Sequence, residues 1–213
     1  MVATSDAIAQ YLREAILRGE LKSQSPLPQD KIANELGVSK VPLREALAEL
    51  KSEGLITYKA NRGAFVTSLS AADAHEIYLM RLALETMALR QAIPKMTKVD
   101  VARPRSALLM IDAEDNPQNW AALNWDFHEA LYQSAAMPHL LATIKTLHIN
   151  VGRYLLLYLD KMAFQTKSQE EHHEILNACI QQDAELACRI LETHLADASQ
   201  SLQDYLRSME GNA

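Results

Sequence analysis

Residues 27–66 read LPQDKIANELGVSKVPLREALAELKSEGLITYKANRGAFV, and this stretch specifies the architecture of the first third of the chain. Gly37 and Gly54 are suited to helix C-termini and end two predicted helices, of which the second opens at Ser39. Pro42 falls in the first turn of that second helix, where backbone N–H groups have no intrahelical partner. Two β-prone runs follow, LITYK and AFVTS, which ANRG joins as a hairpin turn.

An amphipathic run over about residues 5–18 and a Ser/Pro-rich turn, SQSPLPQ, precede this stretch. Three helices and a hairpin predict a winged helix-turn-helix domain over residues 1–68. Residues 70–213 show no further strand pattern and predict an all-α six-helix bundle, so we expect a mostly α protein of two domains. The predicted helices are 71–93, 98–114, 117–135, 138–162, 166–181 and 183–209, and Pro104 makes the second of them the weakest.

The 213-residue composition is that of an ordinary globular protein, with 48% apolar and 23% charged residues. No apolar run approaches the ~20 residues that span a bilayer, and the N-terminus lacks the pattern of a signal peptide. We therefore expect a cytoplasmic protein with no membrane association. Its two cysteines, Cys179 and Cys188, are expected to be reduced, buried thiols.

Net charge alone does not indicate nucleic-acid binding. Residues 1–68 carry nine Lys/Arg and eight Asp/Glu, for +1, and the remainder carries twelve and nineteen, for −7, which together give the net −6. Many DNA-binding domains are far more basic. The placement of the basic residues has to carry that argument.

Polar and basic residues gather on one predicted surface of the first domain. In a recognition helix the N-terminal residues reach base edges in the major groove while the opposite face packs on the core. The predicted contacts from the helix are Ser39, Lys40, Val41 and Arg44, and those from the hairpin tip, or wing, are Lys59, Asn61, Arg62 and Gly63. Lys and Arg can donate to guanine or phosphate, and a helix N-terminus suits a phosphate oxygen.

The words LGVSKVPLREAL, LKSEGL and RGAFV closely resemble the winged-helix domain of the GntR superfamily of bacterial repressors. The resemblance covers about residues 5–68 and implies that Lys40, Arg44 and the Arg62–Gly63 wing contact DNA. Two positions depart from the family pattern. Lys40 stands where Arg is usual, and Asp30 stands where a basic residue often touches DNA, so operator choice is expected to differ.

Polar residues interrupt the apolar faces of three predicted helices in the second domain. In LNWDFHEALY, Asn124 and His128 lie four apart on the apolar stripe of one helix. His172 and His194 lie on the inner faces of two later helices. Facing helices of a bundle build metal sites in this way, and imidazole suits Zn, Ni, Cu and Fe. The alternatives are a hydrogen-bonded core cluster and a dimer surface.

Residues 70–213 resemble the FadR C-terminal ligand-binding domain, the FCD domain, in the words RLALE, NWDFH, EHHEIL and THL. The resemblance implies a divalent metal, Zn or Ni before others, held by Asn124, His128, His172 and His194 beside an effector pocket. Asn124 replaces the usual Asp, which leaves the charge of the metal less compensated. The helix count resembles the shorter, VanR-like subgroup, which disfavours a fatty acyl-CoA effector.

Two arginines interrupt apolar helix faces and are candidates for binding an effector carboxylate, Arg81 and Arg153. For Arg81 the alternative is an ion pair with Glu85, four residues on. The sequence does not assign the direction in which His148 faces, so it is a possible extra polar group in the pocket.

Together these patterns predict a ligand-responsive DNA-binding transcription regulator, a repressor, that senses a small organic acid. We expect a homodimer on a near-palindromic double-stranded operator. The alternative is a metal-dependent enzyme with an accessory winged helix, which would need a general acid or base beside the metal. The sequence offers none apart from the ligands themselves, since Glu129 is predicted to point outward, so we expect no catalytic residues.

Overall fold

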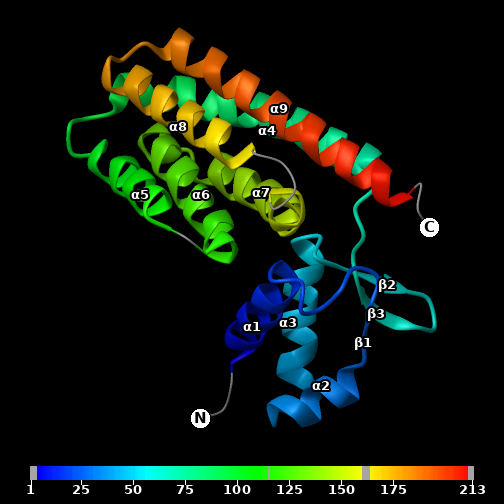
Figure 1. The fold of residues 1–213 in the computed structure, drawn as a ribbon. Helices are drawn as coiled ribbons and strands as arrows, with labels where there is room; N and C mark the ends of the chain where they lie inside the picture. The colour runs from blue at the N-terminus through cyan, green and yellow to red at the C-terminus, as the bar shows by residue number, and fades with distance from the viewer. Residues whose placement is uncertain (1–3, 115, 160–163, 211–213) are drawn as a thin grey trace. The chain divides into compact units, whose positions relative to one another are not determined.

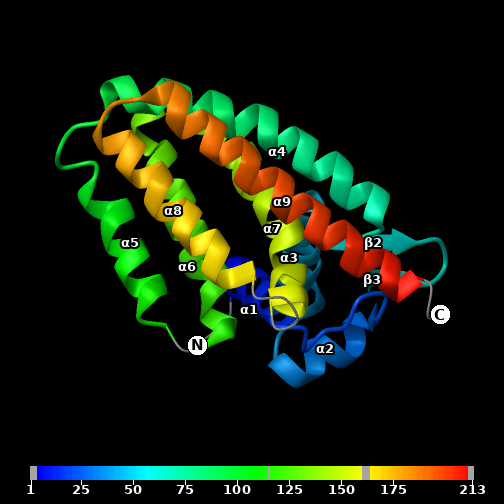
Figure 2. The same ribbon diagram turned by 45° about the horizontal axis from the view of Figure 1, so that its top comes forward.

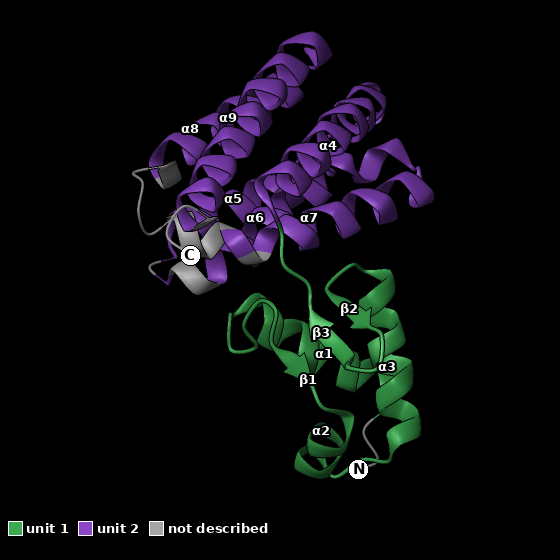
Figure 3. Cartoon of the chain, turned by 90° about the vertical axis from the view of Figure 1, so that its right-hand side faces the viewer, with its two compact units in different colours: residues 1–69 green, residues 70–213 purple. Residues whose placement is uncertain are grey.

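The structure, a computed structural model, describes residues 4–114, 116–159 and 164–210. The chain divides into two compact units, residues 1–69 and 70–213, which Figure 3 draws in different colours. Among the described residues, no helix combines the length and the apolar character needed to cross a membrane.

The first unit contains three helices and a small antiparallel sheet (Figure 1). The helices are α1 (Ser5–Leu17), α2 (Gln29–Leu36) and α3 (Lys40–Ser52), and the strands are β1 (Pro26–Leu27), β2 (Ile56–Lys59) and β3 (Gly63–Val66). β3 lies between β1 and β2 in the sheet. The predicted winged helix-turn-helix plan is therefore confirmed.

The core of this unit forms on the predicted face of α3. Leu43, Leu47 and Leu50 are completely buried, and each contributes roughly 1.5–3 kcal/mol of transfer free energy relative to exposure. α2 ends at Gly37, whose φ of 65° lies in the left-handed region that glycine adopts without a steric penalty. Pro42 sits in the first turn of α3, as predicted.

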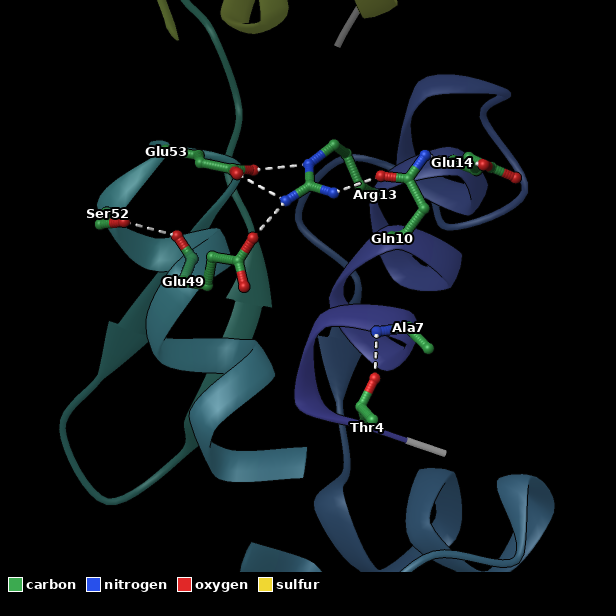
Figure 4. Close-up of polar contacts among 8 residues, drawn as sticks. All are labelled: Thr4, Ala7, Gln10, Arg13, Glu14, Glu49, Ser52 and Glu53. Atoms are coloured by element: carbon green, nitrogen blue, oxygen red, sulfur yellow. Dashed lines mark hydrogen bonds and ion pairs between the residues drawn. The ribbon is translucent and has the colours of Figure 1, made fainter. Parts of the chain in front are cut away.

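A polar clamp joins α1 to α3 (Figure 4). Arg13 donates from Nε and Nη2 to the carboxylate of Glu53, at 2.8 and 2.5 Å, and from Nη2 to Glu49 at 2.8 Å. Its Nη1 donates to Gln10 at 2.6 Å. The side chain of Arg13 is only 13% exposed, and charge-assisted hydrogen bonds strengthen in such partly dry surroundings. The clamp therefore holds α1 along the C-terminal half of α3.

The segment SQSPLPQ was predicted as a turn, but Pro26 and Leu27 within it form the edge strand β1. They pair with Phe65 and Ala64 of β3. An edge strand tolerates proline because one side of its backbone needs no partner. A two-residue strand is too short to show an alternation of polar and apolar residues, so the sequence did not reveal it.

The described part of the second unit is all α-helical. Its helices are α4 (Ala71–Ala92), α5 (Ala102–Asp112), α6 (Pro117–Tyr132), α7 (Pro138–Leu159), α8 (Phe164–Ile180) and α9 (Ala184–Glu210), with 3-10 turns η1 (Ile93–Lys95) and η2 (Gln133–Ala135) after α4 and α6. α4 runs beside α9, α8 packs on α9, α5 on α6, and α7 against α4 and α6 (Figure 1, Figure 2). The predicted six-helix bundle is confirmed. Both cysteines are buried and free.

The prediction was wrong about the start of α5, which begins at Ala102 rather than at residue 98. Thr97 and Asp100 close a turn first, because the Thr97 N–H and hydroxyl donate to the Asp100 carboxylate at 2.8 and 2.7 Å. The later start places Pro104 in the first turn of the helix, where it breaks no hydrogen bond. The other predicted bounds agree within a few residues, and 160–162 lie outside the described residues.

Side-chain caps fix the ends of two long helices. Ser70 and Asp73 form a capping box at the start of α4. Asp183 caps the start of α9, where its carboxylate accepts from the N–H of Leu186 at 2.9 Å. These caps satisfy backbone N–H groups in the first turns of α4 and α9, which have no partner within the helix.

Candidate metal centre and DNA-binding face

Three histidines from three helices meet inside the second unit. His128 lies on α6, His172 on α8 and His194 on α9, and one ring nitrogen from each lies within 4.8 Å of the others. All three are buried. Asn124, one turn before His128 on α6, is also buried and lines the same cavity as His194. The geometry thus gathers imidazoles that lie 66 residues apart in the chain, from 128 to 194.

Aromatic rings enclose the histidines. The Phe127 ring lies 4.8 Å from that of His172 and 5.3 Å from that of His128, and Trp120 stacks 6.2 Å from His172. Burial, reinforced by the neighbouring histidines, lowers the pKa of His128 and of His172 well below the usual range. Both rings are therefore neutral at neutral pH, which is the form that binds a metal.

Hydrogen bonding fixes the tautomer of His128. The Tyr132 hydroxyl donates its single proton to Oε2 of Glu85 at 2.7 Å. At its contact of 3.2 Å with Nδ1 of His128 it can therefore only accept. His128 must carry its proton on Nδ1, so its Nε2 offers a lone pair.

His172 and His194 are oriented in the same way. Nδ1 of His172 lies 3.0 Å from Oε1 of Gln169, whose Nε2 donates to Asp112 at 2.8 Å and thereby fixes the amide orientation. Nδ1 of His194 lies 2.8 Å from Oε2 of Glu171. Both partners are acceptors, so both histidines carry the proton on Nδ1 and keep the Nε2 lone pair free. Metal-ligating histidines are commonly held by such partners.

The polar atoms left over fit a cation. Nε2 of His128, Nε2 of His172 and Oδ1 of Asn124 are buried without a hydrogen-bond partner among the described residues. Each such atom costs roughly 1–3 kcal/mol when it stays unsatisfied. Converging lone pairs repel one another, whereas a divalent ion would satisfy them together. Nitrogen donors with one amide oxygen suit Zn or Ni better than Ca or Mg.

A cavity adjoins this cluster. Its volume is about 20 Å³, which is room for about one water molecule. Its polar lining includes Arg81, Asn124, His148 and His194, and its apolar lining includes Val151 and neighbouring small residues.

Arg81 satisfies both readings that the sequence left open. It is buried, and its Nε donates to Oε1 of Glu85 at 2.6 Å, which is the expected pair along α4. It also lines the cavity. Although burial disfavours its charge, the Glu85 carboxylate more than offsets this and raises the pKa of Arg81. The side chain of the other candidate, Arg153, lies outside the part of the chain that the structure describes.

In the first unit, the predicted DNA-contacting residues of the recognition helix lie at the start of α3. Ser39, Lys40, Val41 and Arg44 are all exposed. Val41 is 64% exposed and is available for contact with an apolar group such as a thymine methyl. The face is therefore open to a partner.

The wing presents the other predicted contacts. Lys59, Asn61, Arg62 and Gly63 are exposed at the turn between β2 and β3. Asn61 and Gly63 have φ values of 56° and 83°, and the Arg62 N–H donates to the Lys59 carbonyl at 3.0 Å. Lys59 and Arg62 pack over the Phe65 ring, which holds their charges near the tip.

A groove connects the helix face to the wing. Its lining includes Lys40 and Arg44 of α3, Arg62 of the wing and Asp30 of α2. Asp30 forms an ion pair with Lys40, with Oδ1 and Nζ 2.5 Å apart. Oε1 of Gln29 accepts a hydrogen bond from Nε of Arg44 at 3.3 Å. Both positions that depart from the family pattern thus contact each other.

Comparison with known proteins matches both units. Residues 4–66 match the model of the bacterial regulatory proteins of the gntR family, and residues 76–197 match the FCD domain. The chain belongs to the GntR family and carries an FCD domain.

Relatives share this organisation. The chain is 29% identical to the HTH-type regulator BphR of Paraburkholderia xenovorans, over 89% of this chain and 81% of BphR. It is 25% identical to the repressor RspR of Escherichia coli, over 92% of this chain and 87% of RspR. A GntR-family regulator from Pseudomonas syringae has a solved structure with a TM-score of 0.63 and 31% identity, which covers 98% of this chain and 89% of that one.

Some residues that shape the metal centre of this GntR-family chain were missed from the sequence. Gln169 stands three residues before His172 on one helix face, a spacing that could have indicated it. Tyr132 stands four residues after His128 on α6, a spacing that could likewise have indicated it. Glu171 meets His194, and Glu85 meets Tyr132, from another helix, so no local spacing could reveal these two. His148, whose direction the sequence left open, is buried at the cavity.

Proposed function

We propose that the protein is a metal-containing, ligand-responsive DNA-binding regulator. The observation that carries the proposal is the arrangement of the three buried histidines. A partner at Nδ1 of each leaves its Nε2 lone pair free, and the cluster lies beside a cavity lined by the buried Arg81. Asn124, His128, His172 and His194 would hold the divalent ion. Such an ion acts as a Lewis acid that binds a carboxylate oxygen.

The effector in this proposal is a small organic acid. Arg81 lines the cavity and supplies guanidinium N–H donors beyond the Nε that Glu85 occupies. The proposed ligands are all neutral, so the ion's charge would favour an anion. The cavity of about 20 Å³ would have to enlarge to admit an acid, and a compact acid requires less enlargement than a long acyl chain.

The DNA partner is a double-stranded operator in the bacterial cytoplasm. Lys40, Arg44 and Arg62 border one groove between the recognition helix and the wing, in a domain of a family of DNA-binding regulators. The name of RspR as a repressor supports repression. Exposed Leu79, Met80 and Met87 on α4 offer an apolar surface for a homodimer, which would read a near-palindromic site.

The enzyme alternative gains no support from the cavity. The sequence predicted no acid or base near the ligands, but the structure places two buried carboxylates there, Glu85 and Glu171. Glu85 accepts from Arg81 and Tyr132, and Glu171 from His194. Neither carboxylate belongs to the described lining of the cavity. Both hold other residues in place, and the matched families are regulators.

Metal analysis of protein purified without chelator tests the proposal. We expect close to one divalent ion per chain in the wild type and little in a His128→Ala, His194→Ala double variant.

DNA selected from a random pool by the wild type supplies an operator. Arg44→Ala should bind it about 5- to 150-fold more weakly, since a base or phosphate contact is worth about 1–3 kcal/mol. Absence of metal after reconstitution would reject the metal centre but not the DNA-binding assignment.

A further inference from the structure

His148 is a buried histidine that the proposed metal site leaves unexplained. It lies on α7, only 5% exposed, and neither ring nitrogen has a hydrogen-bond partner among the described residues. Its ring centroid lies 4.8 Å from that of Trp125 and 6.3 Å from that of His128. Buried polar atoms in proteins nearly always have partners, so a side chain with two vacant nitrogens requires an explanation.

A metal ion would not supply those partners. The cluster of ring nitrogens that approach one another within 4.8 Å consists of His128, His172 and His194, without His148. His148 instead lines the adjoining cavity, together with Arg81 and Asn124. Burial and the nearby Arg81 charge lower the pKa of His148 well below the usual range. Its neutral ring therefore presents one N–H donor and one lone pair.

We propose that His148 is a specificity-determining residue that hydrogen-bonds a hydroxyl group of the effector. The inference rests on the proposed function and deepens it: the effector class becomes hydroxyl-bearing carboxylic acids. A carboxylate oxygen can only accept, whereas a hydroxyl both donates and accepts and so pairs with whichever nitrogen of His148 it meets. The carboxylate would lie toward the ion and Arg81, and the hydroxyl toward α7.

The remaining cavity wall includes apolar side chains. Val151, Leu195 and Ala198 are apolar and would pack against a short carbon skeleton. A site that is built to hydrogen-bond a hydroxyl discriminates strongly against the analogue that lacks it, because the buried partner is then left unpaired.

The test measures binding of matched acids to the metal-loaded full chain by calorimetry. The pairs are glycolate and acetate, lactate and propionate, 3-hydroxybutyrate and butyrate, and malate and succinate. In the wild type we expect at least one hydroxy acid to bind tenfold or more tightly than its partner. His148→Phe should bring that ratio to within about twofold of one, and His148→Gln, which keeps a donor and an acceptor, should restore part of it. Metal content should be unchanged in both variants.

A hydroxyl preference that persists in His148→Phe would overturn the inference, since the hydroxyl would then meet the metal instead. Equal binding within every pair in the wild type would overturn it as well. If none of the acids binds although the metal is present, the proposed sensing function fails along with it. If His148→Phe does not retain metal, the smaller His148→Leu replaces it in the same comparison.

Discussion

Glu171 determines which nitrogen of His194 faces the interior, because its carboxylate accepts from Nδ1 at 2.8 Å. We predict that Glu171→Ala lowers metal affinity by about 10- to 100-fold, the usual effect of removing a partner of a ligating histidine. Competition with a chromogenic chelator measures this. Glu174→Ala, at an exposed position of the same helix, is the matched control. Equal affinity in the two variants would contradict a role for Glu171 in orienting His194.

Asp30 forms an exposed ion pair with Lys40, which is a proposed DNA contact, so the pair would compete with DNA. We predict that Asp30→Asn tightens operator binding by roughly three- to tenfold and steepens the salt dependence by about one phosphate contact. Fluorescence anisotropy at several salt concentrations provides both values. Glu35→Gln, which removes an exposed partner of Lys31 on the same helix, controls for the change in net charge. The same gain in that control would mean that only overall charge matters.

At the scale of elements, local signals predicted most of the fold. Gly37, Pro42 and the ANRG turn each favour a particular local backbone conformation. The helices and hairpin of the first unit could therefore be predicted from them. β1 could not, since it exists only through its pairing with β3. The start of α5 was missed because a side-chain bond between Thr97 and Asp100 competes with helix formation.

The candidate site divides in the same way. Spacing along one helix placed Asn124 and His128 on one face, and the apolar faces of later helices placed His172 and His194 inside. The partner that orients His194 comes from another helix, and so does Glu85, which accepts from the Tyr132 hydroxyl beside His128. Contacts of this kind depend on how helices pack, which the one-dimensional pattern does not contain.

The clamp between α1 and α3 is a feature at the same scale. We predict that Arg13→Met lowers the free energy of unfolding by roughly 1–3 kcal/mol, because two carboxylates lose a partly buried, charge-assisted partner. Urea denaturation measures the change. Arg18→Met is the control: its ion pairs with Glu14 and Glu20 are about half exposed, and such pairs contribute ~0–1 kcal/mol. Similar losses of unfolding free energy in both variants would show that the clamp stabilises the protein no more than an exposed ion pair does.

At the scale of the whole molecule, the buried imidazoles couple stability to pH. Burial lowers the pKa of His128, His148 and His172, so all three are neutral in the folded state above pH 6.5. Below about pH 6.5 these histidines bind protons in the unfolded chain but not in the folded chain. The free energy of unfolding therefore falls as the pH decreases. Each histidine contributes a slope of up to ~1.4 kcal/mol per pH unit.

The measurement is urea unfolding of the metal-free protein between pH 7.5 and 5.0. We expect the free energy of unfolding to be constant above pH 6.5 and to fall below it. His148→Phe should make this fall less steep by the contribution of about one proton. His139→Gln, which removes a histidine at an exposed position, is the control variant for this comparison. A constant stability down to pH 5.0 would contradict the burial of neutral rings.

The neutrality of the ligand set has a consequence for how the regulator responds. Three uncharged imidazoles and an amide would take up a doubly charged ion, while Arg81 and Glu85 already cancel each other. The ion and an acid would therefore each raise the affinity of the other, by the same factor, because binding free energies are reciprocal. Such a protein responds to the product of two concentrations. It would act as a coincidence detector, silent when the cell holds the metabolite without the metal or the metal without the metabolite.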